Sequence, residues 1–330
     1  MADRPASLVT RLGERAGRAA TAAVALVVLS QVVGFSWIPV LWAVQSFTPY
    51  VLAPSIAVGV LAARHRRWPI AGVHGASVVC LIWLAAPVMW PDAPPAVGAD
   101  APRLTIAQGN VFYSNPSPGE ALDALFATGA DVVAITEYSE AAAALAAGDG
   151  AAARYPYLAA NADLTRAGVA LFSRYPIEQI ELGPIGRSQG VVAVLDVAGR
   201  SVRLAVVHPQ PGTSGRGLST WSDDLATIAD RFVPDDTTFD ASVLVGDFNA
   251  TRWHPAFRDL LDRGWTDAHE QIGQGWSASW PNDRVWPPMV RIDHALVDRG
   301  AVALAARNLT LAGSDHAGFV VELGLVSRTG

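Results

Sequence analysis

The hydrophobic residues of this chain are unevenly distributed, and that distribution constrains its fold more than any other feature. Three apolar stretches precede residue 91, namely Ala19–Trp37, Phe47–Ala63 and Pro69–Trp90. Each has close to the ~20 residues that a helix needs to cross the hydrocarbon core of a membrane. A secretory signal peptide would have one short apolar region and a cleavage site, so it fits this pattern less well. We therefore expect about three transmembrane helices within residues 1–90.

The middle stretch departs most from a regular membrane helix. It contains Pro49 and Pro54, although proline is tolerated in membrane helices. The alternative is two spans and a re-entrant segment. The number of spans decides on which side of the membrane the rest of the chain lies.

Arginine is distributed asymmetrically around these stretches. The link between the second and third stretches reads Arg64-His65-Arg66-Arg67, whereas the links after the first and third stretches contain no basic residue. Four further arginines precede the first stretch: Arg4, Arg11, Arg15 and Arg18. Because basic loops stay in the cytoplasm, both basic segments are expected there. With three spans, everything after Trp90 is extracellular; with two, it is cytoplasmic. We predict a multi-pass protein of the cell membrane with its larger domain outside.

The chain after Trp90 has the composition of an ordinary globular domain. Pro91-Asp92-Ala93-Pro94-Pro95 is typical of a stiff linker, so we divide the chain into residues 1–90, 91–102 and 103–326. Residues 101–330 contain 17 arginines and 26 acidic residues, a net charge of −9. Non-specific affinity for nucleic acid comes from basic surface, so nucleic acid is a less suitable partner for such a domain. Cys80 is the single cysteine, which excludes a disulfide within the chain and a cysteine metal site.

Short apolar runs alternate with a few helical patterns in the larger domain. The predicted strands are Leu104–Gln108, Asp131–Thr136, Val169–Ser173, Val191–Val197, Val202–Val207, Ser242–Val245, Ile292–Val297 and Phe319–Val326. The predicted helices are Gly119–Thr128, Glu140–Ala147, Trp221–Phe232 and Pro255–Arg263. Strands with helices between them predict two packed sheets with helices outside.

Polar residues collect at or just past the C-terminal ends of these strands. They are Asn110, Glu137, His208, Asp247, Asn249 and Asp315. Strand ends and the loops after them are where α/β scaffolds gather reactive groups. Carboxylate and amide oxygens there are suited to Mg²⁺ or Mn²⁺. Taken singly, an acid at a strand end and an asparagine in a turn are more often ordinary loop residues.

Two short strings carry more specific chemistry. In Gly246-Asp247-Phe248-Asn249, the aspartate and asparagine are two apart and can point the same way in an extended segment. The aspartate could activate a water while the asparagine holds a phosphate; the alternative is an Asx-rich turn. In Ser314-Asp315-His316, the histidine could contact a phosphate, with Asp293 of Arg291-Ile292-Asp293-His294 fixing its tautomer. The alternative is a polar loop that closes a hairpin.

The sequence around the remaining histidines and around three tryptophans near the C-terminus gives less indication of function. His208 enters a proline-rich loop and could donate to a phosphate oxygen, or could be a satisfied loop histidine. Structural or surface roles are expected for His254, His269 and His294. An apolar wall around a lipid or sugar, or simple loop packing, is expected for Trp276, Trp280 and Trp286.

In order along the chain, these residues resemble the endonuclease/exonuclease/phosphatase superfamily. The resemblance covers about Arg103–Val326 and includes the element Phe172-Ser173-Arg174-Tyr175-Pro176. It implies a four-layer α/β/β/α sandwich of two mixed sheets. It also implies in-line attack of water on a phosphate ester, assisted by Mg²⁺ or Mn²⁺.

The resemblance also implies a role for each matching residue. Metal-side ligands correspond to Asn110, Glu137 and Asp315. The catalytic residues correspond to His208, Asp247, Asn249, His316 and Asp293, the last of which would hold His316.

The N-terminal stretches add a resemblance to a bacterial membrane subgroup that includes teicoplanin-resistance proteins. It implies a membrane-tethered phosphodiesterase or phosphatase, with the lipid bilayer and a lipid-linked or cell-envelope phosphate ester as partners. The alternative is an extracellular magnesium-dependent nuclease similar to DNase I. A binding module without catalysis is disfavoured, because every expected catalytic residue type is present.

Overall fold

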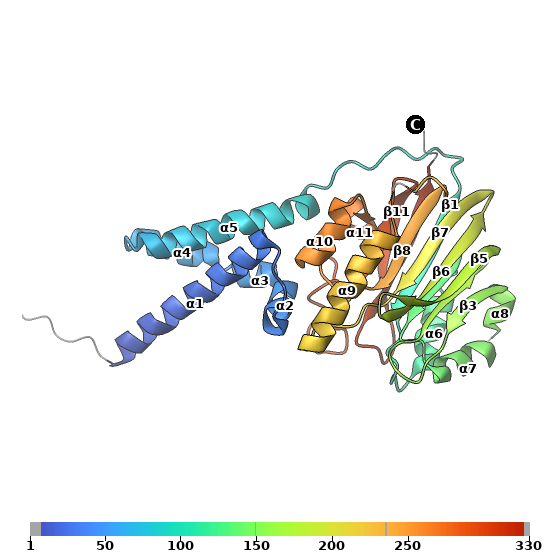
Figure 1. The fold of residues 1–330 in the computed structure, drawn as a ribbon, viewed down its shortest axis with the longest axis horizontal. Helices are drawn as coiled ribbons and strands as arrows, with labels where there is room; N and C mark the ends of the chain where they lie inside the picture. Colours follow the sequence, from blue (N-terminus) through green and yellow to red (C-terminus); the bar gives the residue numbers. More distant parts are fainter. Residues whose placement is uncertain (1–7, 149, 235, 327–330) are drawn as a thin grey trace, which may run out of the picture.

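The computed structural model describes residues 8–148, 150–234 and 236–326. It consists of an N-terminal group of helices attached to one side of an α/β domain (Figure 1). Arg4, one of the arginines used above to orient the membrane segment, lies outside the described residues.

Two of the N-terminal helices are long and apolar enough to cross a membrane. They are α1 (Leu8–Val33), of which Gly13–Val33 has this character, and α5 (Trp68–Met89). Between them lie α2 (Pro39–Ser46), α3 (Thr48–Leu52) and α4 (Ser55–Arg64). The α3–α4 segment together with α2 could make a third span, but the two parts are bent by 85°. The expected apolar helices are therefore present, as two spans or as three if the bent pair counts as one.

The α/β domain contains two mixed sheets of six strands each. The first has the order β11-β12-β1-β2-β4-β3 and the second β5-β6-β7-β8-β10-β9. Only β1–β2 and β7–β8 are parallel neighbours within the described strands; the other pairs are antiparallel. The strands of the first sheet are β1 (Arg103–Asn110), β2 (Val132–Thr136), β3 (Tyr157–Asn161), β4 (Val169–Ser173), β11 (Ala301–Thr310) and β12 (Ala317–Leu325). Those of the second are β5 (Ile177–Ile185), β6 (Ser188–Val197), β7 (Arg200–Val207), β8 (Ala241–Asp247), β9 (Thr266–Asp267) and β10 (Asp293–Val297).

Alternation of apolar side chains along the strands builds the core between the sheets. Leu104 and Ile106 of β1 meet Val243 and Val245 of β8 in one buried cluster. In the strands beneath the helices, residues that point the other way are also apolar, for example Val133 of β2 and Leu244 of β8. The result is the predicted four-layer α/β/β/α sandwich.

Helices cover the outer face of each sheet. Against the first sheet lie α6 (Pro118–Phe126), α7 (Glu140–Gly148) and α8 (Ala151–Arg154). Against the second lie α9 (Gly215–Arg231) and α10 (Pro255–Asp262), while α11 (Ala268–Gln271) follows β9 (Figure 1).

Several elements differ from the predicted ones. Helix α9 begins at Gly215 rather than at Trp221, because Ser214 caps it by accepting from the Gly217 N–H at 3.0 Å. A first turn of glycine, arginine and serine hides this start from an apolar pattern. The edge strand β5 was not predicted because most of its residues are exposed and it has no continuous apolar run. Strands β3, β9 and β11 were also missed, since short or alanine-rich strands carry weak patterns.

Candidate active site

The first sheet contributes an asparagine and a glutamate from parallel neighbours. Asn110 ends β1 and pairs in register with Thr136 of β2, so Glu137 follows directly beside it. The Asn110 Nδ2 donates to Glu137 Oε1 at 3.3 Å and to Asp247 Oδ2 at 3.1 Å. Its Oδ1 accepts from the Phe112 N–H at 2.9 Å. One amide therefore links carboxylates that come from the two different sheets.

The second sheet contributes Asp247 from β8 and His208 from the loop after β7. The His208 Nε2 lies 3.6 Å from Asp247 Oδ2 and 3.9 Å from Glu137 Oε1. Gly246, just before the aspartate, has φ +144° and no room for a Cβ atom, which would lie 2.0 Å from the Val207 carbonyl oxygen. Glycine is required there for β7 and β8 to approach closely enough to bring His208 and Asp247 together.

Asn249 forms a turn around Asp247 and also reaches the loop of His208. Its backbone N–H donates to Asp247 Oδ1 at 2.8 Å, which is the Asx-turn contact of the alternative interpretation. Its Nδ2 donates to the Pro209 carbonyl at 2.9 Å. Asn249 lines the same pocket as Asp247, so the turn and the site are one feature.

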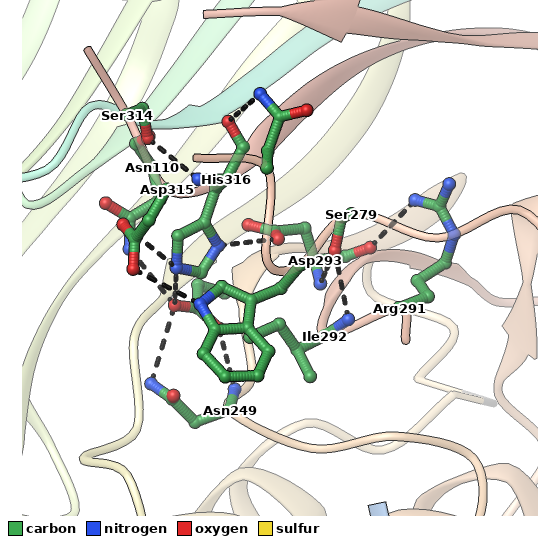
Figure 2. Close-up of polar contacts among 12 residues, drawn as sticks. Asn110, Asn249, Ser279, Arg291, Ile292, Asp293, Ser314, Asp315 and His316 are labelled. Atoms are coloured by element: carbon green, nitrogen blue, oxygen red, sulfur yellow. Dashed lines mark hydrogen bonds and ion pairs between the residues drawn. The ribbon is translucent and has the colours of Figure 1, made fainter. Parts of the chain in front are cut away.

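His316 lies between two aspartates. Its Nδ1 lies 2.8 Å from Asp293 Oδ2, and its Nε2 lies 3.7 Å from Asp247 Oδ2. Figure 2 shows Asp293 on one side of the imidazole and Asp315 on another. The expected contact between Asp293 and His316 is confirmed.

Neighbouring hydrogen bonds fix both members of this pair. Ser314 Oγ donates to the Asn110 carbonyl at 2.7 Å and accepts from the His316 N–H at 3.0 Å. Ser279 Oγ accepts from the Asp293 N–H at 3.3 Å (Figure 2). Gln108 Nε2 donates to Asp293 Oδ1 at 3.2 Å. The orientation of the imidazole is therefore set before any substrate binds.

Asp315 lies at the rim of the site. Its Oδ2 accepts from the Trp280 indole N–H at 3.2 Å, and its Oδ1 lies 3.9 Å from His316 Nε2. It is more exposed than Asp247 and Asp293, with 32% of its side chain accessible. Of the three late tryptophans, Trp280 lines this pocket, whereas Trp276 packs on Trp253.

The backbone is strained where these side chains converge. Three residues at the site that are not glycine have positive φ: Phe112 at 59°, Glu137 at 53° and Asn249 at 46°. Side chains rarely tolerate this region, and such residues cluster at functional sites. The surrounding hydrogen bonds of Asn110 and Asp247 hold this conformation in place.

The carboxylates determine the protonation of the histidines. Burial alone would lower the pKa of His316, but Asp293 and Asp247 outweigh it and raise the pKa to about 10. Burial would also lower the pKa of His208, but Asp247 and Glu137 outweigh it and raise that pKa. Burial would raise the pKa of Asp247, but the two histidines lower it. Asp247 thus lies between two imidazoles whose protonated forms its charge favours.

The chemistry of the donor set fits a divalent cation. Within the described residues, Asp247, Asp293 and His316 offer ligand atoms that all lie within 4.8 Å of one another. This group differs from the predicted set of Asn110, Glu137 and Asp315. Asp293 accepts from His316 and Gln108, and Glu137 accepts from Asn110 and from the Tyr113 N–H, so carboxylates of both sets also have partners within the protein. Oxygen-rich sites of this kind suit Mg²⁺ and Mn²⁺.

The site opens into a pocket of about 350 Å³. Its lining includes the catalytic candidates Glu137, Asp247, Asn249, Asp315 and His316. It also includes residues that were not predicted as functional: Trp42, Ala43, Ser46, Phe47, Phe112 and Arg166. Trp42, Ala43 and Ser46 belong to α2, in the link between the first two apolar stretches, to which no role was assigned from the sequence; Phe47 begins the second stretch.

The other histidines have structural positions. His254, His269 and His294 are all buried, so the structural expectation is confirmed and the surface alternative is wrong. Two of them join neighbouring segments. The His254 Nε2 contacts the Trp42 carbonyl of α2, and the His294 Nε2 contacts the Ala250 carbonyl in the loop after β8. Arg174 similarly packs over the Tyr155 ring at 5.5 Å.

Comparison with known proteins agrees with this geometry. The Endonuclease/Exonuclease/phosphatase family matches residues 107–316, and this chain belongs to that family. The search of curated proteins found no match.

Solved structures share the fold at low sequence identity. A humanized D. rerio TDP2 aligns with a TM-score of 0.58 and 15% identity, over 67% of this chain and 99% of that one. A Neisseria 3′ phosphatase, NExo, bound to a product DNA hairpin, aligns with a TM-score of 0.53 and 20% identity, over 66% and 98%. A Beutenbergia cavernae family member aligns with a TM-score of 0.52 and 16% identity, over 68% and 72%. The aligned share leaves the N-terminal helices outside the common fold.

Proposed function

We propose that this protein is a membrane-tethered phosphoesterase that hydrolyses a lipid-linked or cell-envelope phosphate ester with the help of Mg²⁺ or Mn²⁺. The observation that carries the proposal is the convergence of Asp247, Glu137 and the Asp293–His316 pair at one wall of a pocket. An anionic ester is attracted by the protonated His316 imidazole, and an ionised carboxylate can take a proton from water. Membership of the family supports hydrolysis of a phosphate ester.

Each residue has a chemical role in this proposal. His316, held by Asp293 and protonated at Nε2, donates to a non-bridging phosphate oxygen and stabilises the charge that develops in the transition state. Asp247 orients the attacking water and accepts its proton. Asn249, which lines the pocket, flanks the phosphate, while His208 lies buried behind the pocket wall and holds Asp247. Glu137, Asn110 and Asp315 would hold the divalent cation, which supplies Lewis-acid stabilisation of phosphate charge.

The arrangement of the helices supports an extracellular site. The arginine-rich turn between α4 and α5 lies at the end of these helices away from the α/β domain (Figure 1). Arg67 and Glu14 approach within 4.0 Å at that end. If the arginines are cytoplasmic, the α/β domain is on the opposite side. Tethering would then keep the site close to a membrane-borne substrate, where its effective concentration is high.

The test uses the full chain in lipid nanodiscs, with bis(4-nitrophenyl) phosphate, phospholipids, isoprenyl phosphates and plasmid DNA as substrates. We expect turnover of phosphate esters that depends on added Mg²⁺ or Mn²⁺ and is abolished by EDTA. Absence of turnover for every ester with either cation would contradict the proposal.

A nuclease is the second candidate, because NExo and a D. rerio TDP2 have been solved with DNA. Plasmid degradation faster than lipid hydrolysis in the same panel would favour it. The net charge of −9 over residues 101–330 argues against it.

A further inference from the structure

The short helix α2 does not continue the direction of the helices around it. The segment Thr48–Arg64 is bent by 85° from α2, so if that segment crosses the bilayer, α2 lies along the membrane surface. Residues on its outer side and in the turn before it are apolar and exposed, namely Trp37, Ile38 and Val40. Tryptophan is favoured at the level of the lipid headgroups. In that orientation the exposed apolar residues of α2 and of the turn before it would meet the lipid at the membrane surface.

The inner side of α2 is fixed to the α/β domain. The His254 ring lies 5.2 Å from the Trp42 ring, and its Nε2 lies 3.0 Å from the Trp42 carbonyl oxygen. The Trp42 ring also meets Trp221 of α9 edge to face at 5.8 Å. Gly212 leaves no room for a side chain, since a Cβ there would lie 2.8 Å from the Trp42 ring. The position of α2 against the domain is therefore specific.

A buried polar network beside α2 strengthens this junction. Gln31 of α1 donates to the Trp253 carbonyl at 2.9 Å, and Arg258 donates to Gln31 Oε1 at 2.9 Å. Thr48 accepts from Gln31 Nε2 at 2.8 Å. Buried polar groups need partners, so these contacts disfavour sliding of the helices over the domain.

Helix α2 forms one wall of the pocket that contains the candidate active site. Trp42, Ala43 and Ser46 of α2, with Phe47 after it, line the same cavity as Asp247 and His316. Further apolar walls come from Phe112, Pro211, Trp280, Val290 and Ile292. The pocket thus has an ionic side on the α/β domain and an apolar side on the membrane segment.

We infer that this wall selects an amphiphilic substrate: a phosphate ester whose long hydrocarbon chain stays in the bilayer while its phosphate reaches Asp247 and His316. The inference rests on the proposed function and specifies its substrate class. Removing a hydrocarbon chain from an apolar environment costs about 0.8 kcal/mol per CH₂ group. An apolar wall that connects the bilayer to the catalytic groups avoids most of that cost. Ala43, which is small and exposed, leaves space for the chain beside α2.

The test compares substrates that share a reacting group but differ in chain length. The pairs are long-chain phosphatidic acid with glycerol 3-phosphate, and a long isoprenyl phosphate with isopentenyl phosphate. The first pair reports on an acyl lipid and the second on an isoprenoid. The full chain is assayed in mixed micelles with Mg²⁺ or Mn²⁺, and kcat/KM is measured for each member.

Two variants on the same helix separate the pocket wall from the outer face. Ala43→Asp introduces a charge into the pocket, and Val40→Asp introduces it at a site that is 73% exposed and outside the pocket. We expect wild type to prefer the long-chain member of one pair. Ala43→Asp should lower that preference about tenfold, the equivalent of 1.4 kcal/mol, whereas Val40→Asp leaves it unchanged. Phe47→Ser provides a second wall variant if Ala43→Asp does not fold.

Three outcomes would overturn the inference. Equal kcat/KM for long and short members in wild type would show that the wall does not select a chain. An equal change in Ala43→Asp and Val40→Asp would assign the effect to the membrane surface. In both cases hydrolysis by wild type would leave the proposed function standing, whereas absence of hydrolysis of all four esters and of bis(4-nitrophenyl) phosphate would overturn both.

Discussion

Two buried aspartate–histidine pairs lie on opposite faces of strand β10. In one, His316 Nδ1 lies 2.8 Å from Asp293 Oδ2; in the other, His294 Nδ1 lies 2.5 Å from Asp267 Oδ2. Asp293 and His294 are consecutive, and successive residues of a strand point to opposite sides. The pairs differ at the second ring nitrogen. The His294 Nε2 contacts the Ala250 carbonyl at 2.9 Å, whereas the His316 Nε2 lies near Asp247 and Asp315 in the pocket.

This difference separates a structural pair from a catalytic candidate. Both ring nitrogens of His294 have partners within the protein, and Asp267 also caps α11 by accepting from the His269 and Glu270 N–H groups. In the other pair, the His316 Nδ1 contacts Asp293, and the opposite edge of the imidazole faces the pocket. The same dyad can therefore stabilise the fold or act on a ligand, depending on what meets Nε2.

Removal of the His316 imidazole, which faces the pocket, should cause the largest loss of activity. His316→Ala should lower kcat by a thousandfold or more, because both the donor to phosphate and its charge are lost. The thermal unfolding midpoint should change little by comparison. Hydrolysis of bis(4-nitrophenyl) phosphate in nanodiscs measures the first and circular dichroism the second. Turnover near that of wild type would remove His316 from the site.

Disruption of the other pair should affect stability instead. Asp267→Asn removes a buried carboxylate from His294 and weakens the cap of α11, and it should lower the free energy of unfolding by about 3–5 kcal/mol. The kcat of the folded fraction should stay within a few-fold of wild type. Denaturant unfolding and active-site titration check the two parts. A large loss of kcat with unchanged stability would reverse the assignment of the two pairs.

Removal of the orienting aspartate should change the pH dependence of catalysis. Asp293→Asn should lower kcat about a hundredfold. Burial already acts to lower the pKa of His316, and Asp293 is the first of the charges that raise it to about 10. Without that charge, the protonated form is lost at lower pH, so the alkaline limb of the rate profile should move toward neutrality. An alkaline limb at the wild-type position would contradict the role of Asp293.

A histidine without a carboxylate partner sharpens the comparison. Burial lowers the pKa of His254 to about 4, despite backbone contacts that act to raise it. A lowered pKa means that the neutral form stabilises the fold above pH 6.5 and that this stabilisation is lost as the pH falls toward 4. The stability advantage of wild type over His254→Gln should shrink by about 2 kcal/mol between pH 7 and pH 5. Denaturant unfolding at the two pH values measures it, and a constant advantage would refute it.

The pair formed by Asp293 and His316 also has further carboxylates near it, among them Glu137. Of these changes, loss of the Glu137 carboxylate should have the smallest effect on activity. Glu137→Gln should raise the Mg²⁺ or Mn²⁺ concentration for half-maximal activity about tenfold, since a carboxylate binds these ions better than an amide does. Titration of activity with each cation measures the shift. Glu140→Gln, on the exposed first turn of α7, is a matched control. An unchanged titration for Glu137→Gln would count against its role as a ligand.

Much of the fold followed from local patterns. The apolar runs of β2, β4 and β8 and the apolar face of α6, made by Leu122, Leu125 and Phe126, predicted those elements within a few residues. Edge strand β5 and the polar start of α9 were missed, because an exposed strand and a capped first turn have no apolar period. The contact of Asp293 with His316 was expected from the two short strings that contain these residues and from the family resemblance. The roles of the metal-side residues Asn110, Glu137 and Asp315 stay predictions.

The sequence by itself determined the chemical inventory: apolar stretches of membrane length, strands with polar ends, and the order of carboxylates and histidines along the chain. Those features depend on local periodicity and residue type. Only the tertiary structure decided which of two aspartate–histidine pairs faces a cavity, since Asp293 and His294 are neighbours in sequence and differ by the side of β10 on which they lie. It also decided that α2 forms a wall of the pocket, because Trp42 and Asp247 are about 200 residues apart in sequence and line the same cavity only through long-range packing.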